Sequence, residues 1–203
     1  MKGEKADNKR QFILEEAAKC FGKFGYEKTT LEDIGRVTNM NKATLYYYYK
    51  NKEEIFLAVV LAESERFITD LQAKVRGLEG FEQQIVSYFV ERLGYYQKVV
   101  NLHQLSISTL RQVQPIFDAL YQRVSQKEVL FIESLLAEAQ SAGVVRTAEP
   151  LNAIANALVS IANALKHEAI LQSKAIYSNE VDYTEVEIQT RYIIRLILNG
   201  LTK

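Results

Sequence analysis

Apolar residues along this chain recur at spacings of three and four, which is the period of helices that bury one face. The alternation that predicts β-strands is nearly absent, so we expect an all-α protein of about nine helices. Both prolines, Pro115 and Pro150, fall where a helix is expected to begin, a position that tolerates the missing N–H group. The expected helices cover 8–24, 31–38, 42–49, 52–76, 80–100, 102–112, 115–141, 149–173 and 183–200.

The first fifty residues contain start and stop signals for three short helices. Residues suited to capping precede the second, third and fourth expected helices: either Thr29 with Glu32 or Thr30 with Asp33, then Asn41 and Asn51. The stretch Thr38-Asn39-Met40 is too short for anything but a tight turn, and Asn39 is the residue there that best tolerates a left-handed backbone. Short helices joined in this way predict a three-helix head with a helix-turn-helix unit.

The expected helix at 42–49 has an unusual composition. Leu45 and Tyr49 lie four residues apart and can face inward together, whereas three further tyrosines cover the remaining surface. Exposed consecutive tyrosines would be a costly apolar display without a partner. A DNA duplex explains them, because phenol hydroxyls donate to phosphates while the rings pack on sugars and thymine methyl groups. Residues 1–52 carry a net charge of +4 and residues 53–203 one of −4, which suits a polyanionic partner at the head.

These residues resemble the DNA-binding head of the TetR (tetracycline repressor) family. The resemblance runs without a gap through Ala17, Phe21, Gly25-Tyr26, Thr29-Thr30, Ile34, Asn41-Lys42-Ala43-Thr44-Leu45-Tyr46 and Lys50-Asn51-Lys52-Glu53-Glu54. It implies a nine-helix subunit, a homodimer and release from DNA when a small molecule binds. Matched by position, the DNA-facing residues of the family fall at Thr30, Met40, Asn41, Lys42, Ala43, Thr44, Tyr46, Tyr47, Tyr48 and Lys52. Lys52 lies in the first turn of a helix, where its ammonium and free backbone N–H groups can bind one phosphate.

The head departs from the family pattern at positions that touch DNA. The turn residue is Asn39 and the cap Asn41, where the family has glycine and serine. The small residue of the recognition helix is Ala43 rather than glycine, and its methyl group can contact a thymine methyl. Tyr48 and Tyr49 replace a histidine and a phenylalanine, and we expect the Tyr49 ring inside with its hydroxyl at the edge. The operator sequence is therefore left open.

The expected helix at 149–173 carries polar residues on one arc. Asn152, Asn156, Ser160, Asn163 and His167 fall within about 80° of each other, with alanines beside them. Small residues allow helices to approach closely, so we interpret this face as half of a four-helix dimer interface, and Tyr192 and Leu196 of the last helix belong to the other half. The alternatives are a lining for a pocket or an ordinary solvated face.

Residues 52–203 are expected to form an effector-binding and dimerisation domain behind a DNA-binding domain at 1–51. Bundle cores can hold ligands, and the candidate pocket residues are Phe67, Tyr88, Tyr95, His103, Phe117 and Tyr121. Each of them could equally be plain core. Abundant aromatic and aliphatic side chains favour a small apolar or amphipathic effector.

Other function classes lack support in the sequence. We find no phosphate loop and no catalytic triad, and the two histidines have no ligand-spaced partners, so neither an enzyme, a cofactor nor a metal site is expected. Cys20 is the single cysteine and is expected in the core, and no signal peptide or transmembrane run is present, which fits the cytoplasm. The sequence thus favours a ligand-responsive transcription regulator, in the first place a repressor, that binds a pseudo-palindromic operator as a homodimer. A DNA-binding architectural or constitutive factor that senses nothing is the alternative.

Overall fold

Eight α-helices and one short 3-10 turn make up the computed structural model, in which the backbone is described for residues 2–103 and 105–202 and the side chains for 7–99, 103 and 105–202. The elements are α1 (Lys2–Phe24), α2 (Leu31–Thr38), α3 (Lys42–Tyr48), α4 (Lys52–Arg76), α5 (Phe81–Leu102), α6 (Ile107–Ser141), α7 (Leu151–Gln172), η1 (Ser178–Glu180) and α8 (Thr184–Leu201). The expected all-α class is confirmed, and within the described backbone there is no strand.

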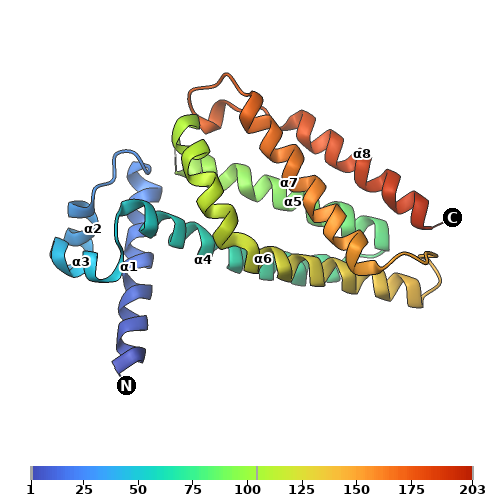
Figure 1. Cartoon of the computed structure of the whole chain (residues 1–203), viewed down its shortest axis with the longest axis horizontal. Coiled ribbons are helices and arrows are strands. Elements are labelled where there is room, and N and C mark those ends of the chain that lie inside the picture. The colour runs from blue at the N-terminus through green and yellow to red at the C-terminus, as the bar shows by residue number, and fades with distance from the viewer. Residues whose placement is uncertain (1, 104, 203) are drawn as a thin grey trace.

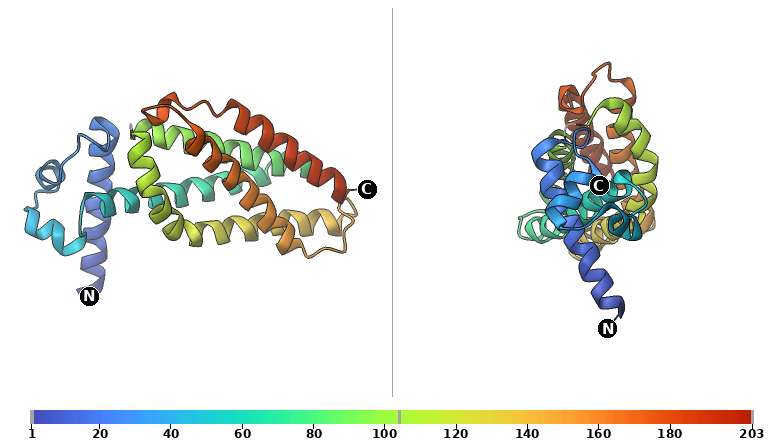
Figure 2. Two further views of the ribbon diagram at one scale, coloured as in Figure 1. Left: turned by 45° about the horizontal axis from the view of Figure 1, so that its top comes forward. Right: turned by 90° about the vertical axis from the view of Figure 1, so that its left-hand side faces the viewer.

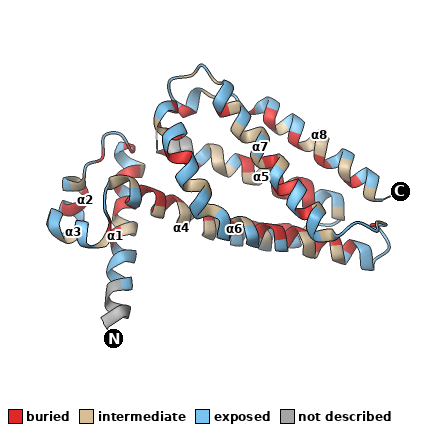
Figure 3. Ribbon diagram, viewed as in Figure 1, coloured by how far each residue is buried: buried red, intermediate tan, exposed pale blue. Residues whose placement is uncertain are grey.

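The head consists of α1, α2 and α3, and the body of α5 to α8 with most of α4 (Figure 1). Helix α4 starts beside the head and continues into the body, as the first view of Figure 2 also shows. Its first turns are buried, with Ile55 and Phe56 packed against Phe21 of α1 in one apolar cluster (Figure 3). A second cluster fills the body between α4, α5, α6, α7 and α8. The head is therefore joined to the body by a continuous helix and a shared core.

Helix α6 corrects the expected boundary at Pro115. We predicted helices at 102–112 and 115–141, whereas one helix runs from Ile107 to Ser141 with Pro115 inside it. The helix begins earlier because the Ser106 hydroxyl caps it, accepting the Thr109 N–H at 3.1 Å. Proline removes one backbone hydrogen bond and crowds the preceding turn, so it bends a helix that packing holds on both sides. Figure 1 shows this bend between the yellow-green and yellow parts of α6.

Other local expectations are confirmed. Pro150 occupies the cap position of α7, and Gly143 adopts a left-handed φ of 74° after α6. Cys20 is buried in the head, and burial raises the pKa of its thiol. None of the helices in the described part of the chain has the length and apolar run needed to cross a membrane.

Candidate DNA-binding surface and ligand cavity

The start of α2 selects one of the two capping boxes that the sequence allowed. Thr30 is the cap: its Oγ1 accepts the Asp33 N–H at 3.1 Å, and the Asp33 carboxylate accepts the Thr30 N–H at 3.0 Å. Thr29 is buried instead, and its hydroxyl donates to the Gly25 carbonyl at 2.7 Å. These bonds satisfy donors that the first turn of a helix leaves free, so they set the direction of α2.

The turn between α2 and α3 depends on two residues. Asn39 has φ 53° and ψ 40°, the left-handed conformation expected for it. Gly35, which sequence reasoning missed, lies where the chain folds back: the Met40 N–H donates to its carbonyl at 2.9 Å. A Cβ built on Gly35 would lie 2.7 Å from the Met40 carbonyl oxygen. A glycine inside a helical pattern is the signal that could have identified this close approach.

Helix α3 presents an exposed face that begins at its N-terminus. Asn41 caps it, accepting the Thr44 N–H at 2.8 Å. Leu45 and Tyr49 are buried as predicted, and the Tyr49 hydroxyl reaches the Arg10 carbonyl at 3.4 Å. Tyr47 is 78% exposed, and its ring contacts the ring of Tyr48 in an edge-to-face arrangement. The other predicted DNA-facing residues of this region divide into exposed ones, namely Thr30, Asn41, Lys42, Ala43 and Tyr46, and half-buried ones, namely Met40, Thr44 and Tyr48.

The two lysines predicted to bind DNA differ in their surroundings. Lys42 is exposed, and its Nζ pairs with Glu32 Oε1 at 2.9 Å across α2 and α3. Lys52 does not point freely outward, because its Nζ donates to the Tyr26 carbonyl at 2.8 Å and lies 4.3 Å from the centre of the Tyr26 ring. Partial burial lowers the pKa of this ammonium. In this conformation Lys52 ties α4 to the end of α1, whereas Lys42 lies on the open face of α3.

A cavity of about 90 Å³, counted as the space open to the centres of water molecules, lies inside the body between α4, α5, α6, α7 and α8. Four of the predicted pocket residues line it. They form two stacked pairs, with ring centres 3.8 Å apart for Phe67 and Tyr95 and 5.2 Å apart for Phe117 and Tyr121. Most of the remaining wall is aliphatic or aromatic.

Two predicted pocket residues, Tyr88 and His103, are not part of the cavity wall. Tyr88 is fully buried in the second core cluster, where its hydroxyl donates to Glu128 at 2.9 Å. His103 is fully buried near the head, with its ring against Phe21 and Phe56. A hydrogen bond to the buried Glu128 carboxylate holds Tyr88 away from the cavity, and packing in an aromatic cluster does the same for His103. Neither contact can be inferred from helical periodicity.

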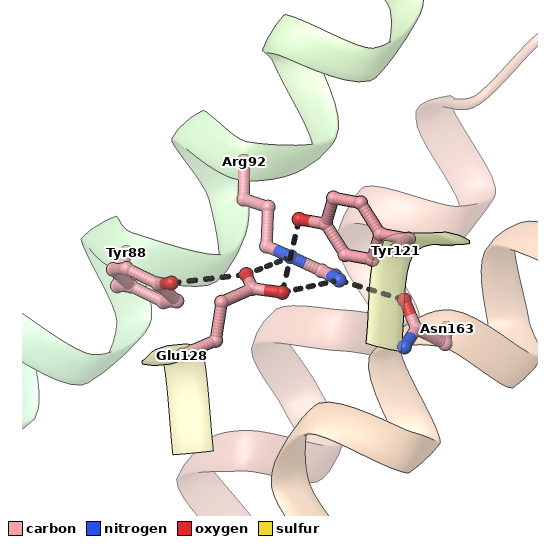
Figure 4. A network of polar contacts seen from close by, with 5 residues as sticks. All are labelled: Tyr88, Arg92, Tyr121, Glu128 and Asn163. Carbon is pink, nitrogen blue, oxygen red and sulfur yellow. Dashed lines mark hydrogen bonds and ion pairs between the residues drawn. The ribbon is translucent and has the colours of Figure 1, made fainter. Parts of the chain in front are cut away.

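One side of the cavity carries a buried polar network (Figure 4). Arg92 of α5 pairs through two nitrogens with Glu128 of α6, and its Nη2 also donates to Asn163 of α7 at 2.7 Å. Glu128 is fully buried and accepts further hydrogen bonds from Tyr88 and from Tyr121, the latter at 3.0 Å. Burial, together with the Glu128 charge, raises the pKa of Tyr88. The network joins three helices and satisfies both charges.

Lys166 of α7 lies on the same wall without such a partner. Its Nζ is 4.4 Å from the centre of the Tyr96 ring, and among the described residues it has neither an ion pair nor a hydrogen bond. Burial, followed by the charge of Arg92, lowers its pKa from 10.5 to about 8. The Tyr96 hydroxyl is also buried, and the Tyr96 ring packs against that of Tyr183 with ring centres 6.0 Å apart.

Sequence reasoning missed three charged residues of this region, although a signal was present. Each occupies an inward position of its helix: Arg92 comes four residues after Tyr88, Glu128 four after Val124, and Lys166 four after Ala162. Charged residues are almost never buried unless paired, so a charge on an apolar stripe indicates a partner or a site.

The predicted dimer face of α7 is divided by the structure. Asn152, Asn156 and Ser160 are exposed, together with Ala153 and Ala157. Asn163 and His167 are turned toward the body instead, because Asn163 accepts from Arg92 and His167 lies 3.4 Å from Asp118 of α6. The polar arc that we read as one face therefore spans the edge between solvent and the cavity.

Helix α8 exposes large apolar side chains at a spacing of four. Tyr192 and Leu196, both predicted for the dimer interface, are 68% and 60% exposed, and Ile188 one turn earlier is 55% exposed. Glu187, Arg191, Arg195 and Glu82 form ion pairs beside this stripe. The stripe has no partner within the described subunit.

A capped helix-turn-helix unit with an exposed second helix, carried on a helical body, defines a transcription regulator of the helix-turn-helix class. Residues 13–59 match the family described as "Bacterial regulatory proteins, tetR family". Its head therefore has the sequence of a DNA-binding domain of the TetR family.

The relatives agree with this assignment over different lengths. An uncharacterized HTH-type transcriptional regulator of Bacillus subtilis, YhgD, is 27% identical over 70% of this chain and 75% of its own. IcaR of Staphylococcus epidermidis, a negative regulator of the biofilm operon icaADBC, is 50% identical over 22% of this chain and 24% of its own. A solved transcriptional regulator from Cytophaga hutchinsonii has a TM-score of 0.75 and 21% identity over 95% of this chain and 98% of its own. This last similarity shows the fold.

Proposed function

We propose that the protein is a repressor that binds a pseudo-palindromic operator as a homodimer and is released by a small ligand in the body cavity. The division into a DNA-binding domain at 1–51 and an effector and dimerisation domain at 52–203 is part of this proposal. Two relatives, IcaR and the repressor AcnR of Corynebacterium glutamicum, are named as negative regulators and match 22% and 32% of this chain. This favours repression here.

The observation that carries the proposal is the contact between the cavity walls and the head. Helix α5 contributes Tyr95, Tyr96 and Val99 to the cavity, and the His103 carbonyl just beyond it accepts the Tyr26 N–H at 2.9 Å. A ligand that moves α5 therefore pulls on the end of α1.

Helix α6 makes a second connection. It lines the cavity with Leu110 and Val113, and at its start Ser106 and Thr109 donate to the carboxylate of Glu27 in the head, Ser106 at 3.2 Å. A ligand shifts the equilibrium between two conformations of a protein only if it binds one of them more tightly. The contacts of α5 and α6 with the head link such a conformational change in the body to the position of the head.

Dimerisation through α7 and α8 is supported by the exposed stripe Ile188, Tyr192 and Leu196 and by the small residues exposed on α7. Contiguous exposed apolar side chains mark interaction surfaces, and a two-fold axis lets one patch pair with its own copy. Light scattering after size exclusion is expected to give twice the subunit mass of 23.2 kDa at micromolar concentration. The Leu196→Glu variant is expected to have the mass of one subunit. A wild-type mass of one subunit would exclude this interface.

DNA binding is tested on an operator selected from random duplexes. The double variant Lys42→Ala, Tyr47→Phe is expected to weaken DNA binding. It should also lower the slope of the logarithm of the binding constant against the logarithm of the salt concentration by about one unit per subunit, since each phosphate contact contributes about 0.9 to this slope. Lys127→Ala, an exposed lysine of the body, serves as the control with an unchanged slope. Equal slopes for the double variant and wild type would refute the role of α3.

Ligand response is tested by thermal unfolding against a small-molecule library, because a ligand that binds the native state raises its stability. Hits are then added to the DNA complex. If compounds that stabilise the protein leave its DNA affinity unchanged, it is an architectural or constitutive factor.

A further inference from the structure

We propose that the cavity binds an amphipathic monoanion of about ten non-hydrogen atoms, with its carboxylate held by Lys166 and its hydrocarbon part enclosed by the aromatic pairs. The inference rests on the proposed function, since it names the class of effector. Its three supports are an unpaired cation, charges elsewhere in the wall that already have partners, and the size and chemistry of the remaining space.

The unpaired cation is Lys166. A charge taken out of water is costly unless it is paired, and surplus cost of this kind is typical of binding sites. The Lys166 ammonium lies over the face of Tyr96, 4.4 Å from the ring centre, and burial, followed by the charge of Arg92, lowers its pKa. A carboxylate supplies the counter-charge and accepts charge-assisted hydrogen bonds from the ammonium.

The other charges of the cavity wall already have partners. Arg92 is neutralised by Glu128 and further bound to Asn163. Asp118 accepts a hydrogen bond from Gln114 at 2.8 Å and lies 3.4 Å from His167. Lys166 is the charged group of this wall that has neither an ion pair nor a hydrogen bond among the described residues. An anion would therefore meet an ammonium without a bound partner, whereas a cation would be repelled by it.

The remaining space is apolar and small. The stacked pairs Phe67 with Tyr95 and Phe117 with Tyr121 face it, with Phe89 and aliphatic side chains around them. A volume of about 90 Å³ is several times the roughly 10–15 Å³ that one water molecule needs, so the cavity has room for several of them. An eight-carbon acid or a phenyl-substituted short acid displaces about that much water. One anionic end and an apolar remainder describe such a molecule.

The test compares ligands that differ only in their head group, measured by calorimetric titration of the full-length protein at pH 7. The probes are octanoate, octanamide and octylamine, together with 3-phenylpropanoate and its amide, so that the shape of the hydrocarbon part is varied independently of charge. We expect at least one carboxylate to bind ten-fold or more tightly than its amide, and octylamine to bind no better than octanamide. An amide or amine that equals its acid would overturn the inference, as would the absence of binding by both acids at millimolar concentration.

Variants locate the effect at the cavity. Lys166→Met is expected to reduce the preference for the acid to about two-fold or less while the amide still binds, and Lys166→Arg is expected to restore much of it. Lys127→Met, on the outside of α6, is the control with full preference. Thermal unfolding verifies that each variant folds. If Lys166→Met retains the ten-fold preference, the anion is not bound at Lys166.

The two proposals fail in different ways. If the acids bind with the expected preference but leave the affinity for the selected operator unchanged, the ligand class stands and the ligand-responsive function fails. If uncharged library compounds release the DNA while the acids do not bind, the regulatory function stands and the anion inference fails.

Discussion

Replacing Glu128 by glutamine is expected to destabilise the protein strongly, because it breaks a buried ion pair. The substitution keeps the volume and one carbonyl acceptor, for either Tyr88 or Tyr121, which donate to different oxygens of Glu128, but it leaves the charge of Arg92 without a counter-ion in the core. Removing one partner of a buried ion pair costs about 3–5 kcal/mol. Domains of this kind have unfolding free energies of about 5–15 kcal/mol, so the loss is a large fraction of the total.

A double-mutant cycle built from the single variants Arg92→Met and Glu128→Met separates the ion pair from simple loss of packing. Arg92→Met alone leaves Glu128 with two tyrosine donors, and we expect it to cost about 3 kcal/mol. The double variant Arg92→Met, Glu128→Met removes both charges, although the Tyr88 and Tyr121 hydroxyls then lose their acceptor at about 1–3 kcal/mol each. The double variant is therefore expected to be more stable than the sum of the two single effects by about 2–4 kcal/mol.

Urea unfolding followed by far-ultraviolet circular dichroism measures all four proteins at one fixed protomer concentration, because dimerisation makes apparent stability depend on concentration. The slope of the unfolding free energy with urea should be the same for all of them. If the single effects add to within about 0.5 kcal/mol, the two charges do not depend on each other and the reasoning about a buried pair is wrong.

Three further predictions concern the turn and the cavity. Gly35→Ala should destabilise the head by about 1–3 kcal/mol in urea unfolding, because its methyl group would lie 2.7 Å from the Met40 carbonyl; a neutral or stabilising effect would contradict this contact. Asn39→Ala should cost about 1–2 kcal/mol and Asn39→Gly little, since only alanine resists a φ of 53°; equal effects would speak against strain at the turn. Lys166 loses its proton at about pH 8 in the folded protein and near pH 10.5 when unfolded, so its burial costs up to about 3 kcal/mol below pH 8, and this cost fades as the pH rises. Lys166→Met should accordingly be more stable than wild type at pH 7, with a difference that shrinks by pH 9.5; a constant difference would exclude this titration.

The caps and the turn of the head were predictable because they depend on short-range contacts. Caps such as Asn41 and the left-handed Asn39 act within three or four residues of their own position, where the sequence already places donor and acceptor together. Short-range patterns also have a limit. Thr29 and Thr30 both fitted the cap of α2 in the sequence, and only the burial of Thr29 against α1 distinguished them in the structure.

Residues whose role depends on contacts across helices were predicted less well. Lys52 was expected on the surface, but the Tyr26 carbonyl, 26 positions earlier in the chain, holds its ammonium. Asn163 shares an arc with exposed asparagines, yet the guanidinium of Arg92 turns it toward the cavity. Periodicity shows which residues of one helix share a face, whereas tertiary packing determines whether that face meets another helix or solvent.

The amino-acid sequence by itself determined the all-α class, the helix-turn-helix head and the residues that its third helix exposes, because helical period, caps and turns are local properties of the chain. The tertiary structure decided that α6 continues through Pro115, that Arg92 and Glu128 neutralise each other, and that Lys166 is left without a counter-ion beside an apolar cavity. Burial and pairing of charges depend on groups that are distant in the chain, and the free energy of a charge in a core is set by whichever of them the fold brings within reach.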